Sequence, residues 1–235
     1  MTTFKLSLLA AVASLGLAGA AHAEDAAPAK DFAIAFNVGA ATDYEFRGVS
    51  QTNRSPQIFA GADATLGSIG YAGVWVSNVD FGNGTKAEYD IYGGFKPTLG
   101  AVAFDLGVIY YGYAHKPSGP DEAYYEVKAL ASVPVGPATI GAAVYYSPEF
   151  FGETGTATYY EVNGAVPVPN TKFTVSAAAG HQEIDAGGSY STWNLGVGYA
   201  ATDHLGFDLR YWDTDEHGFG TIYHSQLALS VKATF

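Results

Sequence analysis

Hydrophobic and polar residues alternate along most of the chain, and the pattern is clearest at its end, in residues 221–235. Apolar side chains occupy every second position from Leu227 to Phe235, and Gln226, Ser230 and Lys232 lie between them. Side chains of a strand point alternately to its two faces, so the segment predicts a strand with one apolar and one polar face. It is longer than an ordinary globular strand of about 5–6 residues. Its length suits a tilted membrane-spanning strand, which needs about 9–11 residues plus its ends.

The same alternation predicts further strands throughout the chain. These are 33–47, 57–66, 71–81, 86–95, 102–113, 122–133, 138–146, 157–166, 172–180, 191–199 and 205–213. The faces of 71–81 are ambiguous because Val74 and Val76 alternate with Trp75, and there we expect Asn78 and Asp80 to point inward.

The connections between these strands fall into two alternating classes. The short ones, such as 67–70 and 200–203, contain Gly, Pro, Asn or Asp, which form tight turns. The others, such as 48–56 and 147–156, are longer and more polar. Transmembrane barrels have short periplasmic turns and longer outer loops. The sequence therefore predicts an all-β, antiparallel up-and-down barrel of about twelve strands, in which the last strand pairs with the first.

A soluble β-sandwich is the alternative, since its strands alternate too. Its polar face meets water and carries many Lys and Glu residues. Here only 14% of residues are charged, against about 25% in soluble domains. Tyr, Phe and Trp lie near the ends of the apolar faces, as in the aromatic girdles of membrane barrels. We therefore favour the barrel.

The first residues have the features of a signal peptide. Lys5 precedes an apolar stretch, 6–20, and Ala21-His22-Ala23 resembles a cleavage site. A membrane anchor is the alternative. We expect residues 1–23 to be removed near Ala23/Glu24, 24–31 to form a mobile periplasmic leader, and 32–235 to form the barrel. This places the protein in the outer membrane of a Gram-negative bacterium.

Charge and cysteine content exclude several classes of function. The formal net charge of −12 argues against nucleic acid, which requires a basic face. The lack of cysteine excludes disulfides, thiolate metal sites and a cysteine nucleophile.

Four blocks of the sequence resemble the TorF family of porins, formerly catalogued as conserved hypothetical proteins. These are 41–52, 71–82, 88–95 and 105–111. The resemblance is dense from 41 to 113; beyond that it rests on the strand-turn rhythm and the terminal Phe235. It implies an outer-membrane barrel with a signal peptide, whose last residue is recognised by the barrel-assembly machinery. It implies little about cargo.

The polar faces are expected to line a lumen. The candidates for pore-lining or constriction residues are Asp43, Glu45, Arg47, Asp63, Glu88, Asp90, Asp105, Glu126, Lys128, Glu161, Asp208 and Arg210. Further inward positions are Asp80, Lys86, Lys96, Glu122, Lys172, His224 and Lys232. Carboxylates outnumber cations in this set, which favours passage of cations over anions. Alternatively, these charges pair across strands and close the lumen.

Two features bear on whether the lumen is open. Asp43, Glu45 and Arg47 share one predicted inward row and form either a constriction or part of the rim. Inward glycines would leave room in the lumen and favour a narrow open channel. They are Gly39, Gly61, Gly107, Gly141, Gly196 and Gly198.

Catalytic and metal-binding signals are weak. His224 and Ser225 are adjacent and point to opposite faces, and strand parity places no Ser beside His181. Asp213, Asp215, Glu216 and His217 form a weak candidate for a divalent-cation site. We expect no enzymatic activity, cofactor or metal.

The sequence thus predicts a passive diffusion channel for small hydrophilic solutes with a mild cation preference, in contact with outer-membrane lipids. The alternatives are a structural or adhesive barrel with a closed lumen and a lipase-type barrel enzyme.

Overall fold

The computed structural model describes residues 32–115 and 118–235. The predicted signal peptide (1–23) and leader (24–31) lie outside the described residues. Among the described residues, no helix is long and apolar enough to cross a membrane.

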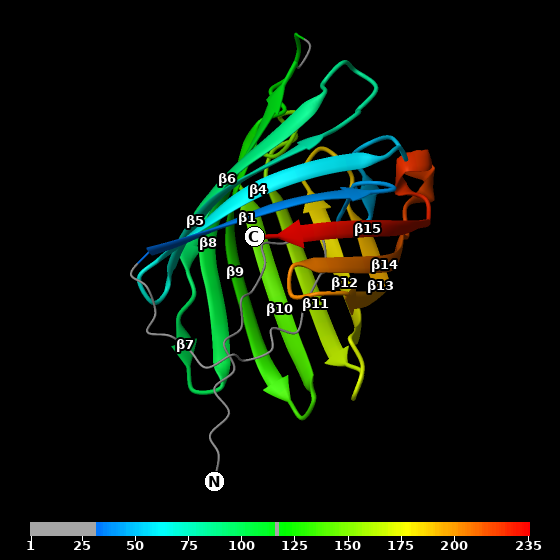
Figure 1. Cartoon of the computed structure of the whole chain (residues 1–235). Helices are drawn as coiled ribbons and strands as arrows, with labels where there is room; N and C mark the ends of the chain where they lie inside the picture. The colour runs from blue at the N-terminus through cyan, green and yellow to red at the C-terminus, as the bar shows by residue number, and fades with distance from the viewer. Residues whose placement is uncertain (1–31, 116–117) are drawn as a thin grey trace.

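Twelve long strands close into one antiparallel barrel in the described part of the chain (Figure 1). They are β1 (Phe32–Ala41), β4 (Gln57–Leu66), β5 (Gly70–Asn78), β6 (Ala87–Phe95), β8 (Val102–Ala114), β9 (Tyr124–Val135), β10 (Ala138–Ser147), β11 (Ala157–Pro167), β12 (Phe173–Ile184), β13 (Tyr190–Ala200), β14 (Leu205–Thr214) and β15 (Gln226–Thr234). The two-residue β7 (Thr98–Leu99) extends the sheet beside β8. Each long strand pairs with its neighbours in the chain, as an up-and-down barrel requires.

The first and last strands close the barrel, as the sequence predicts. In Figure 1 the red β15 lies between the blue β1 and the orange β14. Gly39 pairs with Lys232, and Phe36 and Phe235 exchange backbone hydrogen bonds of 3.0 and 2.9 Å. Pairing both edges leaves no open sheet edge, which is the condition for a strand structure in lipid.

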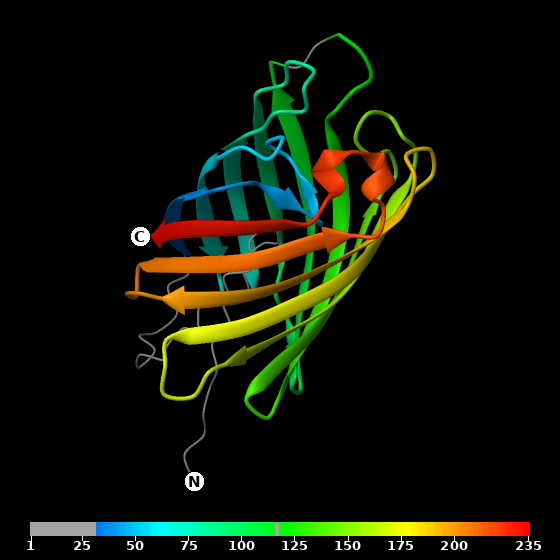
Figure 2. The same cartoon turned by 90° about the vertical axis from the view of Figure 1, so that its right-hand side faces the viewer.

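The two faces of the barrel differ as the alternation predicts. On β1, Ile34, Phe36 and Val38 point outward and are about half exposed. The buried side chains are mainly tyrosines and charged or polar groups, which point into the lumen. An apolar outer face around a polar interior is typical of membrane barrels rather than soluble sandwiches. The longer loops gather at one end, together with the short helices η1 (His217–Phe219) and η2 (Thr221–Tyr223) (Figure 2).

The prediction of a strand over 33–47 is wrong at its end. β1 stops at Ala41, and a separate hairpin follows, made of β2 (Glu45–Phe46) and β3 (Val49–Ser50). Arg47 and Gly48 connect them, and both have positive φ, 52° and 80°. A two-residue turn of this kind reverses the chain tightly, so the segment leaves the wall.

The inward placement of Asn78 is also wrong. Asn78 is exposed, and its side-chain oxygen accepts a hydrogen bond of 2.7 Å from the backbone N–H of Ile58 at the end of the neighbouring strand. Trp75 and Ser77 occupy the inward row instead, where Trp75 packs edge-on against Tyr44 at 5.4 Å.

The predicted final strand, 221–235, begins later than expected. The short helices η1 and η2 occupy 217–219 and 221–223, and β15 begins only at Gln226. His224 therefore lies outside the strand and is exposed, not in the wall of the lumen.

Candidate functional site

The hairpin after β1 lies inside the barrel and contacts the wall on several sides. We call residues 43–55 the lumen hairpin. Its core is the pairing of Glu45 with Ser50 and of Phe46 with Val49. A Cβ at Gly48 would collide with the Thr192 side chain on β13, so glycine permits both the turn and the close approach to the wall.

Arg47, at the tip of the lumen hairpin, binds the opposite wall. Its Nη1 and Nη2 donate to the two carboxylate oxygens of Glu126 on β9, each at 2.8 Å, and Nη1 also donates to Gln182 Oε1 at 2.8 Å. β9 is five strand-to-strand steps from β1 in one direction and seven in the other. The contact therefore spans the lumen. Bidentate pairing is the strongest geometry available to an arginine.

Aromatic rings enclose the same guanidinium. Its central carbon lies 4.3 Å from the ring centre of Tyr159, 4.6 Å from that of Phe46 and 4.8 Å from that of Tyr145. The Tyr111 hydroxyl donates to Glu126 at 3.1 Å. The side chains of Arg47 and Glu126 are only 6% and 1% exposed, and such burial strengthens both the ion pair and the cation–π attraction.

Further contacts hold the base of the hairpin. The Tyr44 hydroxyl donates to Glu88 on β6 at 2.7 Å. Arg54 donates to the backbone oxygens of Thr221 and Ser225, each at 2.9 Å. The hairpin is therefore fixed to the wall near β6, across the lumen at β9, and at the outer loop before β15.

Asp43 and Glu45 are buried together on the hairpin. Ser50 and Thr52 each donate a hydroxyl to Asp43 Oδ1 at 2.7 Å. Asp43 Oδ2 and Glu45 Oε2 are buried and have no hydrogen-bond partner among the described residues. Burial and the adjacent Asp43 carboxylate raise the pKa of Glu45 to about 9, against a smaller opposing effect of Arg54. Glu45 is therefore protonated at neutral pH, and its proton can lie between the two carboxyl groups.

Two further predicted cations, Lys128 and Arg210, pair with carboxylates on the wall, whereas Lys86 and Lys172, predicted to point inward, are exposed. Lys128 Nζ lies 2.9 Å from Asp105, which also accepts the Tyr71 hydroxyl at 2.6 Å. Arg210 lies 3.0 Å from Asp208 and also donates to Asn194 at 2.6 Å. Part of the predicted inward charge is thus neutralised within the wall.

Other predicted acidic residues accept hydrogen bonds from neutral groups, and one oxygen of Asp90 accepts none. Asp63 accepts the Tyr92 hydroxyl at 2.6 Å, and Glu161 accepts from Tyr159 at 2.9 Å and Asn163 at 2.8 Å. Asp90 is buried, and its Oδ1 has no hydrogen-bond partner among the described residues. The lumen therefore retains an excess of acidic groups over cations among the twelve candidates.

The inward glycines do not leave the room that the sequence suggests. A Cβ at Gly39 would collide with the Phe59 ring, one at Gly107 would lie 2.7 Å from the Tyr71 hydroxyl, and one at Gly196 would lie 2.5 Å from the Arg210 guanidinium. Neighbouring side chains thus fill these spaces. Gly198 is the exception, since its nearest neighbour would be 3.8 Å away.

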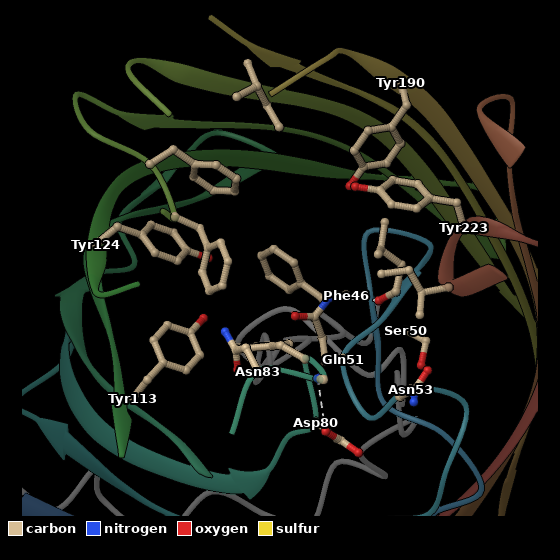
Figure 3. A pocket seen from close by; sticks show the side chains of 17 residues that line it. Phe46, Ser50, Gln51, Asn53, Asp80, Asn83, Tyr113, Tyr124, Tyr190 and Tyr223 are labelled. Atoms are coloured by element: carbon tan, nitrogen blue, oxygen red, sulfur yellow. Dashed lines mark hydrogen bonds between the residues drawn. The ribbon is translucent and has the colours of Figure 1, made fainter. Parts of the chain in front are cut away.

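Two cavities adjoin the lumen hairpin, and Phe46 lines both. The larger, of about 410 Å³, lies among the outer loops, and Phe46 and Val49 form part of its floor. Figure 3 shows Tyr113 and Tyr124 on one side of it and Tyr190 and Tyr223 on the other. The smaller, of about 60 Å³, is lined by Glu45, Arg47 and Glu161 together with aromatic side chains.

In the described part of the chain, the residues considered for catalysis and metal binding form neither a catalytic site nor a metal site. His181 Nδ1 lies 3.2 Å from Ser191 Oγ on the neighbouring strand, so the prediction that no Ser lies beside it is wrong. Asp215 binds the backbone N–H of Ser191 instead of orienting the histidine, and the group therefore lacks the order of a catalytic triad. Asp213 contacts His217 at 2.7 Å, so the carboxylates of Asp213 and Asp215 have different partners. No group of three or more metal-ligating side chains is found among the described residues.

Alternation alone could not identify the partners of Arg47. Gln182 is a neutral residue that follows His181 on an otherwise small-residue strand, and Tyr145 and Tyr159 resemble ordinary aromatic wall residues in the sequence. The available signal was the pair Arg47–Gly48 between two short alternating segments, which is compatible with a two-residue turn.

Comparisons with known proteins agree on the architecture. The chain resembles the KdgM porin with a TM-score of 0.60 and 7% identity, over 86% of this chain and 99% of that one. It resembles the NanC porin with a TM-score of 0.56 and 9% identity, over 86% and 98%. The COG4313 outer membrane channel of Pseudomonas putida F1 gives a TM-score of 0.54 and 8% identity, over 89% and 96%. At these identities the likeness establishes the fold alone.

Sequence comparison gives the family. No curated protein matches the chain. A family model described as "Bacterial protein of unknown function (Gcw_chp)" matches residues 25–235. That description carries no porin label, so the resemblance to the TorF family remains a prediction. The chain belongs to the Gcw_chp family of bacterial proteins.

Proposed function

We propose that the protein is an outer-membrane channel for small hydrophilic solutes, constricted from within by the lumen hairpin. The observation that carries the proposal is the Arg47–Glu126 contact, which connects a segment following β1 to the opposite wall of a porin-like barrel. The two strands of the hairpin form a separate sheet and pair with no strand of the barrel. It can therefore rearrange without breaking the barrel, which a wall strand cannot do.

The charge of the lumen supports a preference for cations. Arg47, Lys128 and Arg210 each pair with a carboxylate, whereas Asp63, Glu88 and Glu161 accept from neutral groups. A passing cation meets acidic groups that are only partly compensated, and an anion meets no comparable surplus of positive charge.

The same arrangement argues against acidic cargo. One solved structure of the KdgM porin is a complex with oligogalacturonate, an acidic sugar polymer. In the described part of this chain the three cations that are fully buried, Arg47, Lys128 and Arg210, are already paired with the carboxylates of Glu126, Asp105 and Asp208, and Lys96 and Lys232 are the partly buried lysines of the lumen. We therefore propose neutral or cationic solutes.

A closed structural or adhesive barrel is the second candidate. The hydrogen bonds and aromatic contacts that fix Arg47 favour it, because they would also suit a permanent plug. The two functions differ in conductance: a plugged barrel conducts no ions, whereas a constricted channel conducts in discrete steps.

Planar-bilayer recording of the purified, refolded protein tests the proposal. We expect small discrete conductance steps and, in a potassium chloride gradient, a reversal potential of the sign given by cation preference. The double variant Asp43→Asn/Glu45→Gln should reduce that preference, and Asp203→Asn, at an exposed turn, should leave it unchanged. Anion selectivity would refute the argument from lumen charge, and a lack of steps under all conditions would refute the channel.

A further inference from the structure

The outer cavity has the size and lining of a small-molecule site. Its volume of about 410 Å³ lies within the range of ligand pockets, roughly 300–1,000 Å³. Aromatic side chains form the largest group in the lining. They come from the lumen hairpin (Phe46), the loop after β5 (Phe81), the wall (Tyr113, Tyr124), the loop after β10 (Phe150, Phe151), and the opposite rim with η2 (Tyr190, Tyr223). We call this cavity the vestibule.

The rings of the vestibule support one another. Phe81, Tyr113 and Phe151 meet edge to face at 5.2–5.5 Å, and Tyr124 meets Phe150 at 4.7 Å. On the other side Tyr190 meets Tyr223 at 5.3 Å. Each group joins a loop side chain to a wall side chain or to another loop. The apolar lining is therefore held in place before any ligand enters, which lowers the entropy cost of binding.

The polar groups at the vestibule are almost all neutral. Of the described residues that line it, Asp80 alone carries a charge, and its carboxylate lies 3.7 Å from Lys86 Nζ. The side-chain amides of Gln51 and Asn53 lie on the hairpin side of the cavity (Figure 3). Such a site offers apolar contact and a few neutral hydrogen bonds, and it provides no cation for an anionic ligand.

We propose that the vestibule binds a neutral small molecule that has one apolar ring and one or two hydrogen-bonding groups, of which a simple phenol is representative. The ring would lie among the aromatic side chains, and the polar group would face the amides of Gln51 and Asn53. This inference goes beyond the proposed function. It does not depend on conduction, because neither Arg47 nor Glu126 lines the vestibule.

Calorimetric titration of the folded protein in detergent micelles with 4-methylphenol tests this inference, with empty micelles as the reference for partitioning. We expect saturable binding at one site per chain. Phe150→Ala and Phe151→Ala should each weaken it by about tenfold, because each removes a ring from the lining. Phe207→Ala makes the same deletion on the outward face of β14 and should leave binding unchanged.

A variant that fills the vestibule and three other ligands provide further tests. Ile222→Trp, on η2, should abolish binding by occupying the cavity while leaving the barrel ladder intact. Glucose, choline and benzoate report neutral hydrophilic, cationic and anionic ligands, and we expect each to bind at least about tenfold more weakly than 4-methylphenol. Non-saturable uptake, equal binding by Phe151→Ala and Phe207→Ala, or stronger binding of any of these three probes would overturn the proposal. A protein that binds 4-methylphenol and yet never conducts would refute the channel alone.

Discussion

At the scale of single residues, the central feature is the guanidinium of Arg47 between Glu126 and three aromatic rings. A buried ion pair adds little net stability by itself, because both charges lose their hydration. Removing one partner is costly, because the other charge then remains buried without compensation. Arg47 is therefore best understood as the group that selects the docked position of the hairpin.

Replacing Arg47 with alanine should release the hairpin. We expect the Arg47→Ala substitution to destabilise docking by about 3–5 kcal/mol, since Glu126 is left unpaired. Single-channel recording should then show larger or longer-lived openings than in the wild type. Lys172→Ala provides a control, because Lys172 is an exposed cation at a turn. The double variant Arg47→Met/Glu126→Met should recover part of the docking, because it removes both charges and keeps apolar volume.

Glu45 makes hairpin docking depend on pH. Its pKa is about 9 when docked, against an ordinary value of 4.5, owing first to burial and then to Asp43. The docked state therefore binds more protons between pH 4.5 and 9, so docking is favoured at low pH and weakens as pH rises through this window. Asp43, Arg47, Arg54 and Glu161 are the other charged groups near it.

The expected result is a conductance that increases from pH 5 to pH 9, by at most about tenfold per pH unit for one proton. Glu45→Gln imitates the protonated form and should remove most of this dependence. Glu153→Gln, at an outer loop where Glu153 is exposed, serves as the control. A decrease in conductance over the same range, or an unchanged profile in Glu45→Gln, would contradict the role given to Glu45.

At the scale of elements, the wall and the hairpin are separate units. The wall strands pair in a closed ladder, and β2 and β3 pair only with each other. Replacing residues 43–55 by a short Gly-Ser linker should therefore leave the barrel folded. The heat-modifiable shift in gel electrophoresis and the β-type circular dichroism of this variant should match those of the wild type. Loss of both signals would mean that the hairpin is required for the barrel itself.

Alternation predicted most of the wall, with Asn78 and residues 221–225 as exceptions, but it did not identify the hairpin, for one physical reason. A hairpin strand alternates with the same period of two as a wall strand, so Asp43, Glu45 and Arg47 fit one inward row in either case. What distinguishes them is the turn at Arg47–Gly48, where the chain reverses inside the barrel. The inward orientation of Gly39 and Gly107 was predictable in the same way. The space beside them is filled by Phe59 and Tyr71 from neighbouring strands, and alternation does not reveal these contacts.

At the scale of the whole molecule, the barrel depends on its last residues for closure. Phe235 exchanges two backbone hydrogen bonds with Phe36 and is exposed on the outer face. Deleting Phe235 removes this end of the β1–β15 seam and the terminal aromatic side chain. We expect less folded barrel in the membrane fraction, with cleavage of the predicted signal peptide unchanged, measured by membrane fractionation and by the molecular mass of the chain. Normal insertion of the truncated chain would show that the terminal residue is dispensable.

From the barrel and the hairpin together we infer that a porin-like wall surrounds a constriction that can move. The most direct test is single-channel conductance of the wild type and of the variant lacking residues 43–55, recorded side by side in the same bilayer and salt. We expect small steps for the wild type and larger steps for the variant, because the variant lacks the constriction. Equal conductance of the two proteins, or none from either, would contradict this inference.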